Sequence, residues 1–207
     1  MLDFNHRPSV SERIAAAIDA GLQQRHVGEA RRTYLGASRL GLACERQLQF
    51  EYAGAPVDAG REFSGQLLRV FEVGHVFEDL AIQWLRAAGF ELITRKANGD
   101  QIGFSAASGR LRGHIDGVIN AVPESMGSVL PVPMLWECKT MHDGSWKDTV
   151  KHGVAKSKPI YAAQLAMYQA YLESTITGLS QNPALFTAIN KDTQALQFEL
   201  VDRKSVV

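Results

Sequence analysis

Two short segments about twenty residues apart combine carboxylate and ammonium side chains. Gly113-His114-Ile115-Asp116 comes first, and Glu137-Cys138-Lys139 follows a run of apolar residues. Because side chains alternate between the two faces of a β-strand, Glu137 and Lys139 point to the same side. If Asp116 ends a neighbouring strand, two carboxylates and one ammonium group converge. Carboxylates hold hard divalent cations and a nearby lysine can steer a water molecule, so this set is the minimum for metal-dependent phosphodiester cleavage.

Two expected helices carry further polar side chains at helical spacing. His75 and Glu78 lie three residues apart and therefore share one face of the first helix. In the second helix, Gln164 and Tyr168 lie four residues apart, and Tyr161 lies one turn before Gln164. Glutamine and tyrosine on one face offer hydrogen bonds and a stacking surface to a nucleic-acid strand. Each pair alone is also typical of an ordinary amphipathic or core helix, so neither identifies a site by itself.

The elements that must position these residues follow from apolar periodicity, capping residues and turn residues. A capping box at Ser9 and Glu12 precedes a helix over 14–24, and Ser38 is expected to cap a second helix that reaches about residue 52. Further helices are expected up to about residue 89 and over 161–175. The first of these has its buried stripe at Val70, Val73, Phe77, Leu80 and Trp84.

Strands are expected at 91–95, 102–105, 111–121, 134–140, 184–189 and 195–201. The first two flank an Asn98-Gly99-Asp100 turn, and the last two form a hairpin. Segments 54–60, 123–133 and 142–159 are expected to be loops, the last one polar and irregular. This order predicts an α/β fold: a central mixed sheet flanked by helices, with an N-terminal helical addition. We expect one domain over 1–207, with a helical part over 1–60 and a catalytic core over 68–201.

Composition places the chain among ordinary globular proteins. It has 207 residues, 45% of them hydrophobic and 21% charged, and its formal net charge is zero. No apolar run approaches the roughly 18–20 residues of a membrane helix, and residues 1–8 lack the apolar core of a signal peptide. We therefore expect a cytoplasmic protein. Its two cysteines, Cys44 and Cys138, are then expected to be free thiols.

Zero net charge argues against nucleic-acid binding through the whole surface, but it does not exclude a local basic groove. Basic residues gather in two places, each of which is also typical of an ordinary solvated face. The members are Arg25, Arg31, Arg32, Arg39 and Arg46, and Lys147, Lys151, Lys156 and Lys158. The usual signatures of zinc proteases, serine hydrolases and P-loop nucleotide-binding proteins are absent from the sequence, as is any C-x-x-C pair.

The order of the motifs is more specific than any one of them. A helix with Gly-His-x-x-Glu, a strand with Gly-x-x-Asp, a strand with Glu-x-Lys and a helix with Gln-x-x-x-Tyr follow one another. This order resembles the RecB-like nucleases of the PD-(D/E)XK superfamily, which include CRISPR-adaptation nucleases and phage recombination exonucleases. The resemblance covers roughly residues 38–201 and includes the segment around Cys44-Glu45-Arg46. It implies a restriction-endonuclease-like core.

The resemblance also implies roles for individual residues. His75, Asp116, Glu137 and the backbone carbonyl of Cys138 would bind Mg²⁺ or Mn²⁺. Glu78 would bind the metal directly or support its ligands, and Lys139 would act on the attacking water together with the catalytic carboxylates. The residues expected to contact DNA are Gln164, Tyr168, Tyr161, Lys158 and Arg46.

Two positions depart from the family pattern. Iron–sulfur members carry three further cysteines near the C-terminus, and this chain has none there, so no iron–sulfur cluster is expected. Residue 115, before the expected metal-binding aspartate, is isoleucine rather than proline, which is common in this branch.

The function implied is a DNA exonuclease that leaves 5′-phosphate products in recombination, repair or phage DNA processing. Its expected partners are single- or double-stranded DNA ends and a recombinase or annealing protein, with no membrane. Two alternatives stay open: a structure-specific or nicking endonuclease on the same site, and a non-catalytic DNA-binding or assembly subunit built on the nuclease fold.

Overall fold

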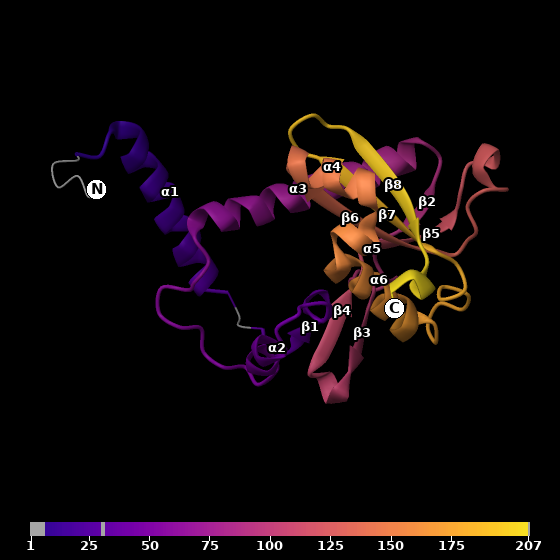
Figure 1. Cartoon of the computed structure of the whole chain (residues 1–207), viewed down its shortest axis with the longest axis horizontal. Helices are drawn as coiled ribbons and strands as arrows, with labels where there is room; N and C mark the ends of the chain where they lie inside the picture. The colour runs from indigo at the N-terminus through magenta and orange to yellow at the C-terminus, as the bar shows by residue number, and fades with distance from the viewer. Residues whose placement is uncertain (1–6, 30–31, 207) are drawn as a thin grey trace. The chain divides into compact units, whose positions relative to one another are not determined.

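The computed structural model describes residues 7–29 and 32–206 and divides the chain into two compact units (Figure 1). Met1–Arg32 and Pro56–His75 form the first unit, and Thr33–Ala55 and Val76–Val207 form the second. The long helix α3, Gly65–Ala87, contributes to both. These bounds differ from the helical part and core expected from the sequence, and the expectation of a single domain stays a prediction. Residues 1–6 and Arg31 lie outside the described residues. Residues 1–6 make up most of the segment 1–8 considered above in relation to a signal peptide.

The first unit pairs α1, Val10–Val27, with the beginning of α3. The predicted capping box is confirmed: the Glu12 amide donates to Ser9 Oγ at 3.2 Å, and the Ser9 amide donates to the Glu12 carboxylate at 2.7 Å. Ion pairs join Asp19 to Arg69 and Arg25 to Glu72. No described residue of α1 is buried, whereas Leu68 of α3 is buried and the His26 ring of α1 lies 5.4 Å from the Phe63 ring.

The second unit contains two sheets. The larger has the order β2-β5-β6-β7-β8, in which only the central pair β6–β7 is parallel. The smaller has the order β1-β4-β3. The strands are Leu35–Gly36 (β1), Glu91–Ile93 (β2), Gly103–Ala106 (β3), Leu111–His114 (β4), Gly117–Ala121 (β5), Met134–Met141 (β6), Ala184–Asn190 (β7) and Leu196–Val201 (β8). The chain is thus α/β with mixed sheets flanked by helices, as predicted.

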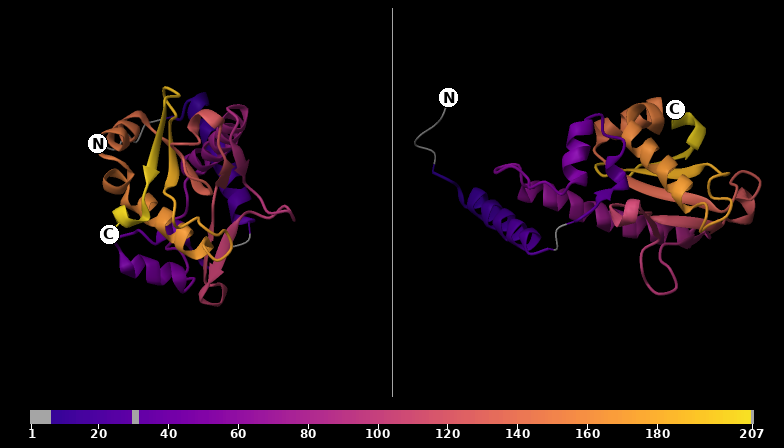
Figure 2. Two further views of the ribbon diagram at one scale, coloured as in Figure 1. Left: turned by 90° about the vertical axis from the view of Figure 1, so that its right-hand side faces the viewer. Right: turned by 90° about the horizontal axis from the view of Figure 1, so that it is seen from below.

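Helices cover both faces of the larger sheet. The helices after β6 gather on one face (Figure 2): α4 (Asp143–His152), α5 (Val154–Ser157) and α6 (Pro159–Leu172). There, Leu165 and Tyr168 pack with Leu135 and Phe186 in one buried cluster. On the opposite face, Ala81 and Leu85 of α3 pack against Trp136, Cys138 and other residues of the strands. Because side chains alternate along β6, this strand contributes residues to two cores, one on each face of the sheet.

The buried face of α3 differs from the predicted stripe. Val70, Val73 and Trp84 are between 40 and 48% exposed, whereas Ala81 and Leu85 are buried. Apolar residues occupy more than one face of this helix, so helical spacing alone could not select the face that meets the sheet.

The predicted strand over 111–121 is two strands in different sheets. β4 ends at His114, β5 begins at Gly117, and Ile115-Asp116 connects them. Glycine permits the close packing on both sides of the break. A Cβ on Gly113 would lie 2.5 Å from Tyr168 Cε1, and one on Gly117 would lie 2.8 Å from Leu92 Cδ1. The break releases Asp116 from regular strand geometry.

The predicted strands over 91–95 and 102–105 also belong to different sheets. β2 pairs with β5 and β3 pairs with β4, although an isolated bridge between Arg95 and Gln101 preserves the predicted turn around Gly99. A local turn signal cannot show that the chain changes sheets on either side of it.

The segment 142–159, predicted to be irregular, is instead helical. His142 Nδ1 accepts from the Ser145 amide at 3.3 Å and caps α4. Gly153 has φ +75°, which glycine adopts without strain, and it separates α4 from α5. Ion pairs one turn apart, such as Lys147 with Asp143, stabilise the helix where its sequence has little apolar periodicity.

Helix α2 spans Glu45–Tyr52 and begins later than predicted. Ser38 lies in a 3₁₀ turn, Ala37–Arg39, and Cys44 occupies the position before α2. The loops over 54–60 and 123–133, apart from a short 3₁₀ turn at Glu124–Met126, agree with the prediction, as does the hairpin of β7 and β8.

Candidate active site

Glu137 stands near the middle of β6, a strand with neighbours on both sides. Its side chain is only 1% exposed, and it is the buried carboxylate around which the other predicted residues gather. Gln164 Nε2 donates to its Oε1 at 2.9 Å, and the Lys139 ammonium pairs with the same oxygen. The other oxygen, Oε2, is buried without a hydrogen-bond partner among the described residues. A buried carboxylate oxygen with no partner is energetically unfavourable and marks a place for a ligand.

Asp116 reaches this carboxylate from the connection between β4 and β5. Its Oδ2 accepts a hydrogen bond from the Cys138 amide at 2.8 Å and lies 3.7 Å from Lys139 Nζ. The predicted convergence of Asp116, Glu137 and Lys139 is therefore confirmed. It depends on the break that separates β4 from β5, which the sequence interpretation treated as one strand.

Lys139 lies on the same side of β6 as Glu137, as strand alternation predicts. Its side chain is 26% exposed, and its Nζ also donates to the Cys138 carbonyl at 3.1 Å. The ammonium lies 5.9 Å from the centre of the Tyr161 ring. The lysine thus joins the buried carboxylate to the solvent-accessible edge of the cluster, where a charged oxygen could approach it.

Gln164 and Tyr168 of α6 support the buried carboxylate. Gln164 Nε2 donates both to Glu137 and to the Tyr168 hydroxyl, the latter at 2.8 Å. Both side chains are buried. Phe104, which the sequence interpretation missed, packs edge-on against Tyr168 and stacks on Tyr171 at a ring separation of 4.4 Å. No local pattern identifies Phe104, because it reaches α6 from another sheet.

Carboxyl groups crowd together in this cluster. Burial and the neighbouring charge of Asp116 raise the pKa of Glu137 to about 8, although Lys139 opposes the shift. Burial is also the main cause that raises the pKa of Glu78 on α3 to about 7, and the charge of Asp116 is the second. The pKa of Lys139 is raised well above its ordinary value by Asp116 and Glu137, against the opposing effect of burial. One ammonium group therefore faces three carboxyl groups, which favours a further cation.

The donor set fits a hard divalent cation. The unpartnered Glu137 oxygen, the Asp116 carboxylate and the Cys138 carbonyl supply oxygen atoms, which Mg²⁺ and Mn²⁺ prefer. Within residues 7–29 and 32–206, no three His, Cys, Asp or Glu side chains already form a group that could hold a metal ion. His75 ends the first compact unit, three residues before Glu78 in the sequence, so its role as a ligand stays a prediction.

The remaining predicted residues lie outside this cluster. Lys158 pairs with Asp148 at 3.5 Å, and the Arg46 guanidinium lies over the Phe50 ring at 5.5 Å. Cys44 is exposed, whereas the Cys138 thiol is buried in the core, and burial raises its pKa. As strand alternation requires, the Cys138 side chain lies on the other face of β6 from Glu137 and Lys139, where it packs with Trp136 and Ala81.

Comparisons with known proteins assign neither a family nor a function to this chain. No protein-family model matches the chain, and no curated protein matches it in sequence. Among solved structures, "Crystal structure of SSO0001" is similar, with 13% identity and a TM-score of 0.47 over 94% of this chain and 82% of that one. In the described part of the chain, no helix is both long and apolar enough to cross a membrane. The functional interpretation therefore rests on the cluster around Glu137.

Proposed function

We propose that this protein is a metal-dependent DNA nuclease with a PD-(D/E)XK core. The observation that carries the proposal is the buried Glu137 carboxylate, which keeps one oxygen unpartnered beside Asp116 and Lys139. An arrangement that serves only stability would satisfy that oxygen, because an unpartnered buried carboxylate is destabilising. The same argument disfavours an inactive scaffold that happens to retain these residues.

Asp116, Glu137 and the Cys138 carbonyl would hold Mg²⁺ or Mn²⁺, with His75 and Glu78 as additional ligands or supports. When bound, the cation supplies Lewis acidity and lowers the pKa of a coordinated water. Lys139 contributes positive charge where the phosphodiester gathers negative charge during attack. Gln164 keeps Glu137 in place through its hydrogen bond of 2.9 Å. Tyr161, Tyr168, Lys158 and Arg46 stay proposed DNA contacts.

The first test is cleavage of end-labelled single- and double-stranded DNA with Mg²⁺ or Mn²⁺. Lys139→Ala should reduce the rate at least about a hundredfold, since it removes the only ammonium group paired with this cluster among the described residues. Lys191→Ala, an exposed lysine at the β7–β8 turn, is the matched control and should cut normally. A Lys139→Ala protein that cuts as fast as the wild type would show that the site is wrongly assigned.

The exonuclease assignment rests on the family resemblance, and a covalently closed circular DNA tests it separately. An exonuclease leaves this substrate intact, whereas an endonuclease linearises or nicks it. A third assay addresses the scaffold alternative. Mn²⁺ should raise the melting temperature of the wild type but not of Asp116→Ala, and a protein without either a metal-dependent shift or cleavage would be a scaffold.

A further inference from the structure

Strand β4, which lies between β1 and β3 in the smaller sheet (Figure 1), carries exposed basic residues on one face. Arg112 and His114 are exposed and alternate with the buried Gly113. A Cβ on Gly113 would meet the Tyr168 ring of α6, so the opposite face of β4 is the packed one. Arg110, also exposed, comes directly before the strand. Arg110, Arg112 and His114 are called the basic row below.

Uncharged groups hold the two arginines of this row in place. The Arg110 guanidinium lies 4.4 Å from the centre of the Tyr52 ring and donates to the Tyr52 carbonyl at 3.3 Å. The Arg112 guanidinium lies 5.0 Å from the centre of the Tyr34 ring and donates to the Gly109 carbonyl at 3.0 Å. Over residues 7–29 and 32–206, no carboxylate forms an ion pair with either arginine. Both guanidinium groups are therefore positioned without being neutralised.

A positioned guanidinium group without an acidic partner favours an anionic ligand. Arg39 provides the contrast, because the Glu51 carboxylate accepts two hydrogen bonds from it, at 2.7 and 3.0 Å. Guanidinium groups bind phosphate oxygens through pairs of N–H donors. Positive groups that follow one another along a surface attract a chain of phosphates, because each contact releases a counterion. The basic row therefore has the chemistry of a nucleic-acid backbone site.

The strands on either side of the row place small, uncharged residues beside it. Arg112 lies opposite Gly36 of β1 and Ser105 of β3. His114 lies opposite Gly103 of β3. Paired residues of neighbouring strands share a face of the sheet, so these small residues leave room for a backbone to lie along the row. A single line of basic groups matches the single line of phosphates of one strand.

The row leads to the candidate active site through a polar pocket of about 590 Å³. His114 lines this pocket together with Arg95 and Lys96 from the turn before β3. The Asp100 carboxylate also lines it, but a hydrogen bond of 2.8 Å to a neighbouring side chain holds that group within the turn. Asp116 follows His114 by two residues. Basic groups thus continue from the row to the last turn before the candidate metal-binding carboxylates.

We propose that the basic row and this pocket bind the phosphates of the DNA strand that enters the candidate active site. The direction of the strand rests on the proposed nuclease function, whereas binding to the row does not. An extended chain spans at most about 3.6 Å per residue, so the Cα atom of Arg112 lies within about 14 Å of that of Asp116, and that of Arg110 within about 22 Å. Phosphates of a B-form strand follow one another every 3.4 Å or so along the axis, so the row contacts the strand within a few nucleotides of the scissile bond.

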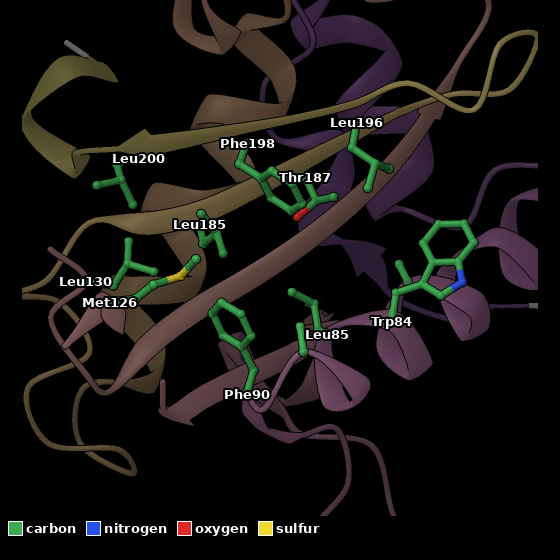
Figure 3. A pocket seen from close by; sticks show the side chains of 12 residues that line it. Trp84, Leu85, Phe90, Met126, Leu130, Leu185, Thr187, Leu196, Phe198 and Leu200 are labelled. Atoms are coloured by element: carbon green, nitrogen blue, oxygen red, sulfur yellow. The ribbon is translucent and has the colours of Figure 1, made fainter. Parts of the chain in front are cut away.

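The apolar side of the larger sheet is unsuited to this ligand. Leu196, Phe198 and Leu200 of β8 are 42, 46 and 43% exposed, and with α3 and β7 they line a pocket of about 480 Å³ (Figure 3). The polar group labelled there, the Thr187 hydroxyl, already accepts from Trp136 Nε1 at 2.9 Å. None of the residues that line this pocket is charged. A chain of phosphates finds no opposite charge on this open row, in contrast to the basic row on β4.

Fluorescence anisotropy of a labelled single-stranded oligonucleotide of about twelve nucleotides, in the presence of EDTA, measures binding without cleavage. The Arg110→Ala/Arg112→Ala protein should bind at least about tenfold more weakly at low salt. Its plot of log affinity against log salt concentration should lose about 1.4 in slope, because each lost phosphate contact removes about 0.7 for a single strand. The Arg203→Ala/Lys204→Ala protein, which loses two exposed positive charges near the C-terminus, is the matched control.

Two further variants separate charge from packing. Arg110→Lys/Arg112→Lys keeps both charges and should keep the salt slope of the wild type. Lys96→Ala removes an exposed ammonium group of the pocket and should reduce the slope by about 0.7. Circular dichroism and thermal melts establish that each variant is folded, and the Lys96→Ala result stands even if the alanine pair is unstable.

Cleavage kinetics with Mn²⁺ distinguish this inference from the proposed function. The Arg110→Ala/Arg112→Ala protein should raise KM for the oligonucleotide about tenfold with kcat nearly unchanged, because the row binds the strand away from the scissile bond. A wild type that binds through the row but does not cut would refute the nuclease function and leave the row standing. A wild type that cuts, with unchanged binding and KM in the double variant, would refute the row alone.

A wild type that does not bind the oligonucleotide in EDTA would also overturn the inference. So would equal losses of affinity in the double alanine variant and in the Arg203→Ala/Lys204→Ala control. Poly-glutamate serves as a competitor in the same assay. Tighter binding of this polypeptide than of DNA would assign the row to an acidic protein partner and would contradict the inference.

Discussion

Replacing Glu137 by glutamine should make the metal-free protein more stable at neutral and alkaline pH. The folded-state pKa of Glu137 is about 8 and its ordinary value is 4.5. Because the folded state holds this proton more tightly, the carboxyl group contributes stability that is complete below pH 4.5 and is lost as pH rises through 8. Glutamine keeps the side-chain shape and an oxygen for Gln164 and Lys139, but it carries no charge to desolvate.

The size of the effect follows from the position of the two pKa values. Between them, the free energy of unfolding falls by as much as ~1.4 kcal/mol per pH unit. Between about pH 5.5 and 7.5, ionisation of Glu137 should therefore lower the free energy of unfolding of the wild type by about 2–3 kcal/mol. The Glu137→Gln protein should not show this loss. Glu78, whose pKa is about 7, adds a loss of the same sign in both proteins.

Urea denaturation in the presence of EDTA, repeated at several pH values, measures this difference directly. Glu124→Gln, at an exposed position in the 123–133 loop, controls for the loss of a charge. Stability curves of the wild type and Glu137→Gln that run parallel across this pH range would refute the reasoning. Such a result would mean that Glu137 carries no excess proton affinity in the folded state.

Two further predictions concern the shell around the carboxylate. Gln164→Leu should lower the free energy of unfolding, measured by urea denaturation, by about 1–3 kcal/mol and should slow cleavage, because the amide that bridges the buried carboxylate and Tyr168 is lost. An unchanged free energy of unfolding would contradict the role of that bridge. Gly113→Ala should destabilise the protein by about 1–3 kcal/mol, since its Cβ would lie 2.5 Å from Tyr168 Cε1 and 2.7 Å from Phe104 Cε1. Gly21→Ala, with no atom within 4 Å of its Cβ, should not destabilise the protein, and equal losses in both variants would exclude the packing explanation.

Local sequence pattern alone was sufficient to predict several parts of this structure. The capping box at Ser9 and the terminal hairpin depend on neighbours in sequence, and both are confirmed. Strand alternation placed Glu137 and Lys139 on one face and Cys138 on the other, because the period of a strand is fixed by its backbone.

Only the tertiary structure decided where the chain changes sheets and which faces are buried. The break at Ile115-Asp116 brings Asp116 to the Cys138 amide. Glycine is needed at positions 113 and 117 because Tyr168 and Leu92 pack against them, and only the tertiary structure places those side chains there. The buried face of α3 and the open row on β8 were equally beyond the sequence, since a pattern shows that residues are apolar but not which partner covers them. The raised pKa of Glu137 likewise arises from burial and from Asp116, which a linear sequence does not place together.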